Sequence, residues 1–403
     1  MQPPPPAFDI AIVGAGPVGL LLAGLLGARG LRVLLLEKRT GPAAHSQAIG
    51  ITPPSLHILA KLGMDQAFIR QGVQVRDCQV HGESGRLGCL TFRHIPDEHR
   101  FILALPQTQT CALLQQRLAA FPSVTLLQGC AVEGVSQHTD HCTLALSGGT
   151  LRTATAAYVV ACDGSRSRLR ELAGFTATGS SYKVHFVMGD FIDRTGLKDE
   201  AHLFFKAAGS VESFPLPGGL RRWIVQTPRR LETAPAGLIP EIVRQRAGID
   251  LESADQLNQS TFTPRRLNCG RYHQGRVILC GDAAHVMSPI GGQGMNTGFA
   301  DAEFLAGALP AMLQPGVNPA PLLAAYHRYR RKAAQTAIRR AGLGMWLGTW
   351  TGRPLSFLRD CILRNLLGHA FTQRFMGPYY AMLTIPYNTL ERVPLDVFKP
   401  RPA

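Results

Sequence analysis

The fold is decided near the start of the chain, by the stretch Asp9-Ile10-Ala11-Ile12-Val13-Gly14-Ala15-Gly16-Pro17-Val18-Gly19. Its apolar run, from Ile10 to Val13, predicts a parallel strand that is buried on both faces. The glycines predict a tight turn into a helix. Gly14 permits the turn, Gly16 lets an anion approach the backbone, and Gly19 lets the helix pack on the strand. Such a turn places an anion at the positive end of the helix dipole.

The residues that follow complete the pattern of a dinucleotide-binding unit. Apolar residues from Val18 to Leu26 predict a helix that stops near Gly30, and Leu31 to Leu36 predict a second strand. Glu37 ends that strand and can accept hydrogen bonds from a ribose 2′-hydroxyl. An acid at this position favours FAD or NAD, whose ribose carries no phosphate. The alternative interpretation is a Rossmann-like unit that binds nothing.

Length, composition and charge limit the class of protein. The 403 residues are enough for two or three domains, and 45% hydrophobic with 17% charged residues indicates a globular chain. The proline-rich start, Met1 to Pro6, lacks a basic region followed by an apolar run, so we expect no signal peptide. A formal net charge of +15 can attract NAD(P)H, acidic substrates or anionic lipid. We predict no nucleic-acid partner, because no aromatic-basic RNA signature or helix-turn-helix is present.

The nine cysteines are scattered through the chain, with no CxxC spacing and no adjoining histidine cluster. Such a set predicts a reducing compartment, and argues against a disulfide framework or a structural metal. We therefore expect a cytoplasmic protein with no metal site.

The order of strand patterns predicts a discontinuous core. Short alternating runs, typical of antiparallel strands, occupy Val75 to Phe101 and Phe175 to Phe262, whereas Tyr158 to Cys162 and Arg276 to Asp282 resume the buried-strand pattern. We predict an α/β protein: a Rossmann-like FAD-binding domain (residues 8–75, 102–175 and 265–320), an inserted antiparallel-sheet substrate domain (76–101 and 176–264) and a helical C-terminal segment (321–403). Within the substrate domain, Phe214 to Gly219 predicts a turn between strands.

The C-terminal segment allows two interpretations. It contains a basic stretch from Tyr326 to Arg340, and Pro354 can begin a helix with Leu355, Leu358 and Ile362 on one face. No run reaches the roughly 18 apolar residues that a membrane-spanning helix needs. The helix either packs on the core or lies on a membrane surface, which would make the protein peripherally membrane-associated.

Two further motifs place a carboxylate and a glycine at the end of a strand: Asp163-Gly164 and Gly281-Asp282. The loop from Pro289 to Gly294 then offers backbone N–H groups before a helix that opens at Met295-Asn296. This junction suits an electron-rich ring that becomes anionic on reduction.

These three motifs, in this order and spacing, resemble the single-component FAD-dependent monooxygenases with the para-hydroxybenzoate hydroxylase fold. The resemblance covers residues 8 to about 310. It implies bound FAD, NADH or NADPH as a transient reductant, and O2. A flavin C4a-hydroperoxide would then hydroxylate an aromatic or polyketide-like substrate. A second dinucleotide domain is not expected, because Gly342-Leu343-Gly344 follows no strand.

The resemblance also implies cofactor contacts. Glu37 looks like the ribose acid, Gln107 is similar to the glutamine that contacts the flavin's sugar chain, and Asp282 would hold the ribityl chain. Asp163 and Gly164 look like a motif that serves both FAD and NAD(P)H. The candidate set is Gly14, Ala15, Gly16, Pro17, Val18, Gly19, Glu37, Lys38, Arg39, Gln107, Val132, Asp163, Gly164, Asp282, Pro289, Gly292, Gly294, Met295 and Asn296. The family often has arginine where this chain has Gln47.

No residue is assigned a catalytic role from the sequence. Tyr182, His185, Trp223 and His285 are predicted to pack or to support the site. Two alternatives to the monooxygenase stay open: a redox-silent FAD-binding scaffold, and a flavin-dependent halogenase or reductase on the same fold. Halogenases of this architecture usually carry a WxWxIP stretch, and the nearest segment here, which begins at Trp223, lacks the second tryptophan. The substrate and the oligomeric state are left open.

Overall fold

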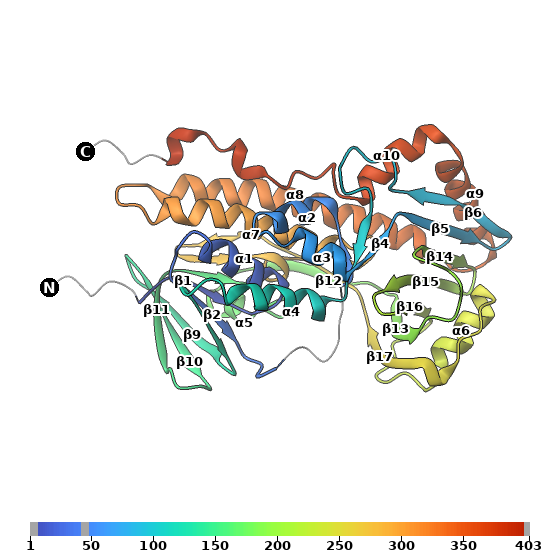
Figure 1. Cartoon of the computed structure of the whole chain (residues 1–403), viewed down its shortest axis with the longest axis horizontal. Coiled ribbons are helices and arrows are strands. Elements are labelled where there is room, and N and C mark those ends of the chain that lie inside the picture. Colours follow the sequence, from blue (N-terminus) through green and yellow to red (C-terminus); the bar gives the residue numbers. More distant parts are fainter. Residues whose placement is uncertain (1–6, 42–47, 399–403) are drawn as a thin grey trace.

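The computed structural model describes residues 7–41 and 48–398 and shows two large sheets toward opposite ends of one molecule (Figure 1). Gln47 lies outside the described residues. Two helices, α7 (Gln293–Met312) and α8 (Pro319–Gly348), run lengthwise between these ends. At about 1.5 Å per residue, the 30-residue α8 is about 45 Å long, which is enough to contact both halves.

The first sheet contains the predicted dinucleotide-binding strands. Its order is β19-β20-β11-β1-β2-β8, with β10 and β9 continuing from β11. The strands are β1 (Phe8–Val13), β2 (Val33–Glu37), β8 (Val124–Gln128), β9 (Ala131–Gln137), β10 (Cys142–Ser147), β11 (Thr153–Ala161), β19 (His273–Gln274) and β20 (Val277–Leu279). The four pairs from β20 to β8 are parallel, so the carboxyl ends of these strands meet at one edge. Ile10, Ala11 and Ile12 have no exposed surface, which confirms the buried strand.

Helices cover the first sheet and begin at its carboxyl edge. Helix α1 (Pro17–Gly27) has proline in its first turn and packs against α4 (Gln107–Leu118) and α7. It ends at Gly27, and Gly30 (φ 75°) makes the turn into β2. Shorter helices are α2 (Pro53–Ala60), α3 (Asp65–Gln71) and α5 (Arg168–Leu172).

The second sheet has seven strands in the order β17-β13-β16-β15-β14-β5-β6. They are β5 (Asp77–Gly82), β6 (Gly85–Thr91), β13 (His185–Ile192), β14 (Ala201–Lys206), β15 (Gly209–Leu216), β16 (Leu220–Thr227) and β17 (Gln256–Phe262), and α6 (Leu238–Ala247) packs on one face. All pairs are antiparallel except β14 with β5. That pair joins two separate chain segments, so no hairpin dictates its direction.

One predicted turn is shorter in the structure. The chain from Phe214 to Gly219 was expected to be a turn, but β15 continues through Pro215 to Leu216. Only the residues from Pro217 onward form the turn, where Gly218 and Gly219 both adopt positive φ. The residues of β15 therefore stay paired with β16 up to Leu216, and this pairing fixes which side chains of β15 share a face with those of β16.

Two small sheets connect the large ones. One contains β3 (Gly50–Ile51), β7 (Ile102–Ala104) and β4 (Val73–Val75), and the other contains β12 (Ala177–Ser181), β18 (Arg265–Cys269) and β21 (His285–Val286). Strand β12 pairs with β18, so the two ends of the long insertion leave and rejoin the first half side by side. This pairing holds the two halves around a shared space.

The C-terminal segment forms α8, α9 (Arg353–Gly368) and α10 (Ala370–Tyr380). Helix α9 packs on β6, where Leu367 lies against Gly88. Its buried Arg359 donates to the carbonyl oxygens of Trp350 (2.8 Å) and Phe205 (2.8 Å). Leu355 and Leu358, which were predicted to share an apolar face with Ile362, are 46% and 50% exposed, so most of this face is not packed on the core. Among the described residues no helix has the length and apolar character to cross a bilayer.

The glycine pattern Gly342-Leu343-Gly344 lies inside α8, so it is not a dinucleotide turn. A Cβ at Gly344 would be 3.0 Å from a methyl group of Ile290, and one at Gly348 would be 3.2 Å from the ring of Phe205 on β14. The glycines thus allow α8 to approach both the loop before α7 and the second sheet.

Candidate functional site

A single cavity of about 1800 Å³ lies between the carboxyl edge of the first sheet and one face of the second. Pockets for one small ligand usually enclose about 300–1,000 Å³, so this space can take two molecules. Its lining includes the three predicted glycine and carboxylate turns, the loop before α7, and residues from all seven strands of the second sheet.

The first turn is shaped by backbone contacts that only glycine permits. Gly14 has φ 104°, and a Cβ there would lie 2.5 Å from the carbonyl oxygen of Cys162. A Cβ at Gly19 would lie 2.0 Å from the carbonyl oxygen of Gly14. At Gly16 a Cβ would meet no protein atom within 4 Å and would project into open space at the cavity wall. Gly14 and Gly19 are therefore required by packing, whereas Gly16 leaves room for a ligand.

The turn also presents an uncapped helix end. Gly16 is the N-cap of α1, and among the residues that the structure describes no side chain caps the first turn of that helix. Its free N–H groups and the helix dipole favour a negatively charged group at this place.

Glu37 lies at the end of β2 and lines the cavity. Its Oε2 accepts a hydrogen bond from the backbone N–H of Ala15 (2.9 Å), and its Oε1 accepts one from Nε of Arg39 (2.9 Å). Burial favours the neutral carboxyl, but the hydrogen bonds from Arg39 and Ala15 outweigh it and hold the pKa of Glu37 below its usual value. The carboxylate is therefore charged, oriented and able to accept hydrogen bonds from ribose hydroxyls.

The second turn carries a carboxylate atom with no hydrogen-bond partner among the described residues. Oδ2 of Asp163 accepts a hydrogen bond from the backbone N–H of Leu169 (3.0 Å), but its buried Oδ1 has none. Burial raises the pKa of this carboxyl. Gly164 adopts φ 82° beside it. A buried polar atom of this kind usually meets a ligand or water, and here it lies at the cavity wall.

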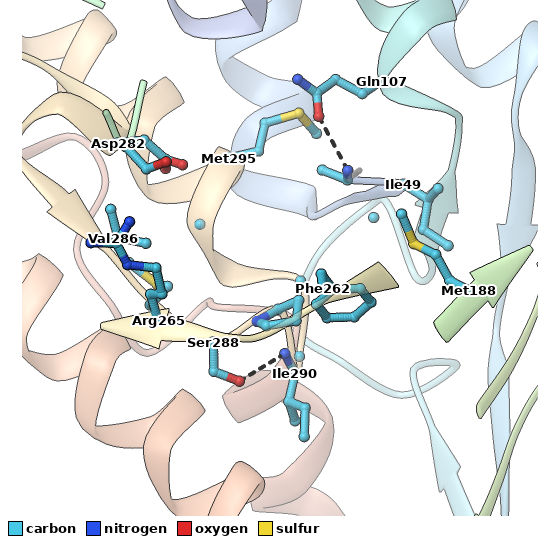
Figure 2. Close-up of a pocket in the computed structure, with 18 of the residues that line it drawn as sticks. Ile49, Gln107, Met188, Phe262, Arg265, Asp282, Val286, Ser288, Ile290 and Met295 are labelled. Atoms are coloured by element: carbon cyan, nitrogen blue, oxygen red, sulfur yellow. Dashed lines mark hydrogen bonds between the residues drawn. The ribbon is translucent and has the colours of Figure 1, made fainter. Parts of the chain in front are cut away.

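The third turn opens Asp282 toward the same space. Its carboxylate is exposed to the cavity although it lies deep within the protein, and burial raises its pKa. Figure 2 shows Asp282 and Met295 facing a common space from two sides. A Cβ at Gly294 would be 4.0 Å from Oδ1 of Asp282, so the start of α7 lies directly beside this carboxylate.

A buried ionic network holds the third turn in place. Oδ2 of Asp301 accepts hydrogen bonds from the backbone N–H of Gly281 (3.1 Å) and pairs with Nε2 of His285 (2.6 Å). Nε of Arg330 donates to Oδ1 (2.8 Å). Burial opposes the charge on Asp301, but His285 and Arg330 hold its pKa below the usual value. Arg330 belongs to the basic stretch from Tyr326 to Arg340, but it is only 1% exposed. Its charge therefore serves this buried network and is not available to a membrane surface.

The loop before α7 presents backbone groups to the cavity. Gly291 (φ 80°) and Gly292 (φ 62°) adopt conformations that favour glycine, and no side chain caps α7. Asn296 donates to the carbonyl oxygens of Gly50 (2.9 Å) and Gly292 (2.6 Å) and accepts from the N–H of Thr52 (3.0 Å). This side chain ties the loop to β3, so its role is to fix the cavity wall.

Gln107 joins the opposite wall. The side-chain Oε1 of Gln107 accepts a hydrogen bond from the backbone N–H of Ala48 (3.1 Å), drawn as a dashed line in Figure 2. The backbone N–H of Gln107 donates to the carbonyl oxygen of Ala48 (3.0 Å). The side chain lies at the start of α4 and lines the cavity.

The structure brings most of the candidate set to this one space. The candidates that line it are Gly14, Gly16, Pro17, Val18, Glu37, Lys38, Arg39, Gln107, Val132, Asp163, Gly164, Asp282, Pro289, Gly292, Gly294 and Met295. Ala15, Gly19 and Asn296 are not among the lining residues. Ala15 offers its N–H to Glu37, while Gly19 and Asn296 act through the packing and hydrogen bonds given above.

The four polar candidates divide into two groups. Tyr182 and His185 line the cavity; His185 pairs through Nδ1 with Thr263 (2.8 Å), and the hydroxyl of Tyr182 has no partner among the described residues. Trp223 is fully buried in the core under α6, and His285 belongs to the Asp301 network. These two positions agree with the packing and supporting roles that we expected.

Donors that could hold a metal ion gather once among the described residues, away from the cavity. His57, Glu98 and His99 place one ligand atom each within 4.8 Å of one another. His57 pairs with Oδ2 of Asp97 (2.9 Å) and contacts Glu98 (3.6 Å), and His99 contacts Glu98 as well (3.8 Å), so these side chains already have partners within the protein.

Sequence reasoning missed the far part of the cavity. Alternate residues of the second sheet face it, among them Met188, Leu203, Glu212, Phe214 and Ile224. Their period-two pattern was visible, but a strand alone does not tell which of its two faces meets a cavity. Cys130, in the turn from β8 to β9, and Ala131, the first residue of β9, also line it and had no sequence signal.

The observations fit FAD along the first part of the cavity. Two uncapped helix ends suit a pyrophosphate and an electron-rich ring, Glu37 suits a ribose, and the carboxylate of Asp282 suits the hydroxyls of a sugar chain. The glycine at position 16 leaves open the space that a side chain would fill. The second sheet then supplies an apolar wall for another molecule.

Comparison with known proteins gives the same result. A family model described as FAD binding domain matches residues 7–341. A rifampicin monooxygenase from Streptomyces venezuelae is 33% identical over 338 residues, which cover 82% of this chain and 70% of that protein. The structure of an anhydrotetracycline hydroxylase from Streptomyces rimosus matches with TM-score 0.77 and 29% identity, over 94% of this chain and 77% of the other.

The fold extends over nearly the whole chain. The structure of a p-nitrophenol 4-monooxygenase from Pseudomonas putida matches with TM-score 0.82 over 98% of this chain and 99% of the other, at 23% identity. The family and fold expected from the three motifs are therefore confirmed, and the scaffold and halogenase alternatives are not carried further. The chain belongs to the FAD-binding-domain family and is a FAD-dependent monooxygenase.

Proposed function

We propose that this monooxygenase hydroxylates an aromatic or polyketide-like small molecule that binds between FAD and the second sheet. The observation that carries the proposal is the single cavity, in which glycine and carboxylate turns line one part and apolar strand residues line the other. The substrates that name the rifampicin and anhydrotetracycline relatives support a polyketide-like molecule.

The positions of these groups support a set of FAD contacts. The N–H groups at the start of α1 would bind the pyrophosphate, Glu37 would bind the adenosine ribose with Lys38 and Arg39 beside it, and Asp282 would bind the ribityl chain. Gln107 and Val132 would border the sugar chain, with Asp163 and Gly164 in the same part of the cavity. Pro289, Gly292, Gly294 and Met295 would border the ring system, where the α7 dipole would stabilise negative charge.

The cofactor and the protein divide the chemistry. FAD, once reduced by NADH or NADPH, supplies the activation of O2 and the transfer of one oxygen atom. The protein binds the substrate against Met188, Phe214 and Ile224, holds it in one orientation, and keeps water away with an apolar wall. No side chain is needed as a nucleophile.

The reductant is expected to bind transiently at a basic edge of the cavity. Arg166, Arg168, Arg230 and Arg265 line this space, and the chain has a net charge of +15. Positive side chains there attract the phosphates of NADH or NADPH.

The proposal is tested with purified protein loaded with FAD. It should oxidise NADH or NADPH in the presence of O2, and the rate should rise when an accepted aromatic or polyketide compound is added. Mass spectrometry should detect a product that is one oxygen atom heavier. If no compound from a broad phenol and polyketide panel stimulates oxidation or gains oxygen, the proposed substrate class is wrong.

The domain division and the cellular location are part of the proposal. We assign residues 8–75, 102–175 and 265–320 to FAD binding, 76–101 and 176–264 to substrate binding, and 321–403 to a helical segment.

All nine cysteines are free thiols, which supports a reducing, cytoplasmic location. The exposed Leu355, Phe357 and Leu358 of α9, with Arg353 and Arg364 nearby on the same helix, support a peripheral contact with anionic membrane.

A further inference from the structure

The substrate part of the cavity contains one carboxyl group whose role the FAD contacts do not explain. Glu212 lies on β15, and its side chain lines the cavity. In the register of the sheet it stands opposite Leu203 of β14 and Ile224 of β16, both of which also line the cavity. Phe214, two residues along on the same face, is apolar as well.

Within the described part of the chain, Glu212 has neither a hydrogen bond nor an ion pair through its side chain. Burial alone raises its pKa from 4.5 to about 7. Glu212 is half-buried and its carboxyl group opens into the cavity among apolar neighbours. Holding a carboxyl group at this depth without a protein partner costs stability, and such groups are found where a ligand completes them. An apolar residue at this position would avoid the cost, so the presence of Glu212 points to a functional reason.

The neighbouring titratable groups do not supply the missing partner. Arg222 lines the same face but is committed to Asp190, to which its Nε (2.7 Å) and Nη2 (2.9 Å) donate. Burial raises the pKa of Cys78 on β5 and raises that of Tyr380 on α10 to about 12, so both are neutral at pH 7. His185 of β13 also lines the cavity, but it pairs through Nδ1 with Thr263 (2.8 Å). None of these four side chains therefore supplies a partner for Glu212.

We propose that Glu212 recognises the substrate by accepting a hydrogen bond from a donor group, an O–H or an N–H, on an otherwise apolar aromatic molecule. The inference rests on the proposed function, because it places the substrate against the second sheet. A ligand that presents a carboxylate at this position is rejected, since two negative charges would meet in an apolar space. The donor is either a phenolic hydroxyl or an ammonium group, and these two share the same hydrogen-bond chemistry.

Four two-ring probes separate these sources by isothermal titration calorimetry on the FAD-loaded protein. They are 2-naphthol, 2-methoxynaphthalene, 2-naphthylmethylamine and 2-naphthoate. At pH 8 we expect at least one donor, the naphthol or the amine, to bind about tenfold or more tightly than the methoxy compound, and 2-naphthoate to bind more weakly than it. Whichever donor binds more tightly identifies the group that Glu212 recognises.

Variants assign the preference to Glu212. In Glu212→Gln the charge is lost at constant shape, so the preference for the donor should fall about tenfold and 2-naphthoate should bind more tightly than in the wild type. Glu212→Leu, which fills the space with an apolar group, should lose the preference entirely. Glu241→Gln, an exposed acid on α6 outside the cavity, is the matched control and should behave as the wild type.

The pH dependence gives a second readout. In the wild type the amine's advantage over 2-methoxynaphthalene should grow between pH 6 and pH 8, as Glu212 ionises, and in Glu212→Gln it should stay flat over this range. The inference is overturned if 2-naphthoate binds the wild type as tightly as the donors, or if both Glu212 variants leave the ratios unchanged. Binding needs neither NAD(P)H nor turnover, so a failure of hydroxylation and a failure of this inference are separate results.

Discussion

The two parts of the cavity are built in different ways. The FAD part is made mainly of backbone: glycine turns, helix ends and a few carboxylates that follow strands of the first sheet. The substrate part is made of side chains from one face of the second sheet, with Glu212 among apolar neighbours. The FAD part depends on glycines that no other residue can replace. In the substrate part, each substitution on the cavity face of the second sheet can change the chemistry of the wall separately.

This difference explains why one cofactor can serve many substrates on one fold. Backbone N–H groups at the starts of α1 and α7 can bind the same cofactor in any sequence that keeps the glycines of these two turns. The alternating residues of β13 to β16 are free to vary as long as the opposite face stays apolar under α6.

The largest effect is expected in the backbone site, from Gly19→Val. A Cβ at this position would overlap the carbonyl oxygen of Gly14, so α1 cannot keep its contact with β1. We expect a loss of about 4 kcal/mol or more of stability and no bound FAD, as measured by thermal unfolding and flavin absorbance. Gly16→Ala is the matched control: its Cβ meets no protein atom, so Tm should be unchanged while FAD binds more weakly. Equal stability loss in both variants would contradict this account.

The next effect is expected at the buried network behind Asp282. Arg330→Met leaves the buried Asp301 with His285 and the N–H of Gly281 but without its arginine, and breaking a buried pair costs about 3–5 kcal/mol. Urea unfolding measures the loss. Arg328→Met, on the exposed side of the same helix, should change stability by about 0.5 kcal/mol or less. A similar result for both arginines would mean that the network does not stabilise the third turn.

Asp282→Ala sharpens the comparison without breaking the fold. The carboxylate opens into the cavity and bonds to no protein group among the described residues, so we expect Tm of the FAD-free protein to stay within a few degrees. Hydrogen bonds to a charged group contribute about 1.5–3 kcal/mol, so FAD affinity should fall roughly tenfold to hundredfold. Fluorescence titration with FAD measures it. Unchanged affinity would remove Asp282 from the cofactor site.

In the substrate part, Glu212→Gln should stabilise the protein in a pH-dependent way. The folded pKa of Glu212 is raised from 4.5 to about 7, so the folded state binds more protons than the unfolded state between these values. The wild type therefore loses stability as pH rises through this window, by about 1–3 kcal/mol, and the variant does not. Denaturant unfolding at pH 4.5 and pH 8 should give equal stabilities at the lower pH and a more stable variant at the higher one. A constant difference would contradict the shift.

The smallest effect on stability is expected from Phe357→Ser on α9. Its side chain is 73% exposed, so the free energy of unfolding should change by about 0.5 kcal/mol or less. Phe304→Ser on the buried α7 should cost about 3–5 kcal/mol and serves as the contrast. If α9 contacts membrane, Phe357→Ser should also reduce cosedimentation with anionic phospholipid vesicles. Wild-type protein that does not cosediment would rule out that contact.

The three turns could be predicted from sequence because each depends on local chemistry. Gly14 and Gly19 are needed where a strand passes into a closely packed helix. Glu37 ends β2, and Asp163 and Asp282 come shortly after the ends of β11 and β20. The carboxyl ends of parallel strands meet at one edge, so these local signals converge without knowledge of the rest of the chain.

The sequence by itself thus determined the nucleotide-binding half, its cofactor class and the alternation of the second sheet. Only the tertiary structure decided which face of that sheet meets the cavity, and that Arg330 is buried against Asp301 while Leu355 and Phe357 are exposed. It also decided that the cavity-lining neighbours paired with Glu212 across the sheet are the apolar Leu203 and Ile224. The reason is physical: a glycine's conformation is set by its own backbone, whereas the burial and charge of a side chain are set by elements that are distant in sequence and close only after folding.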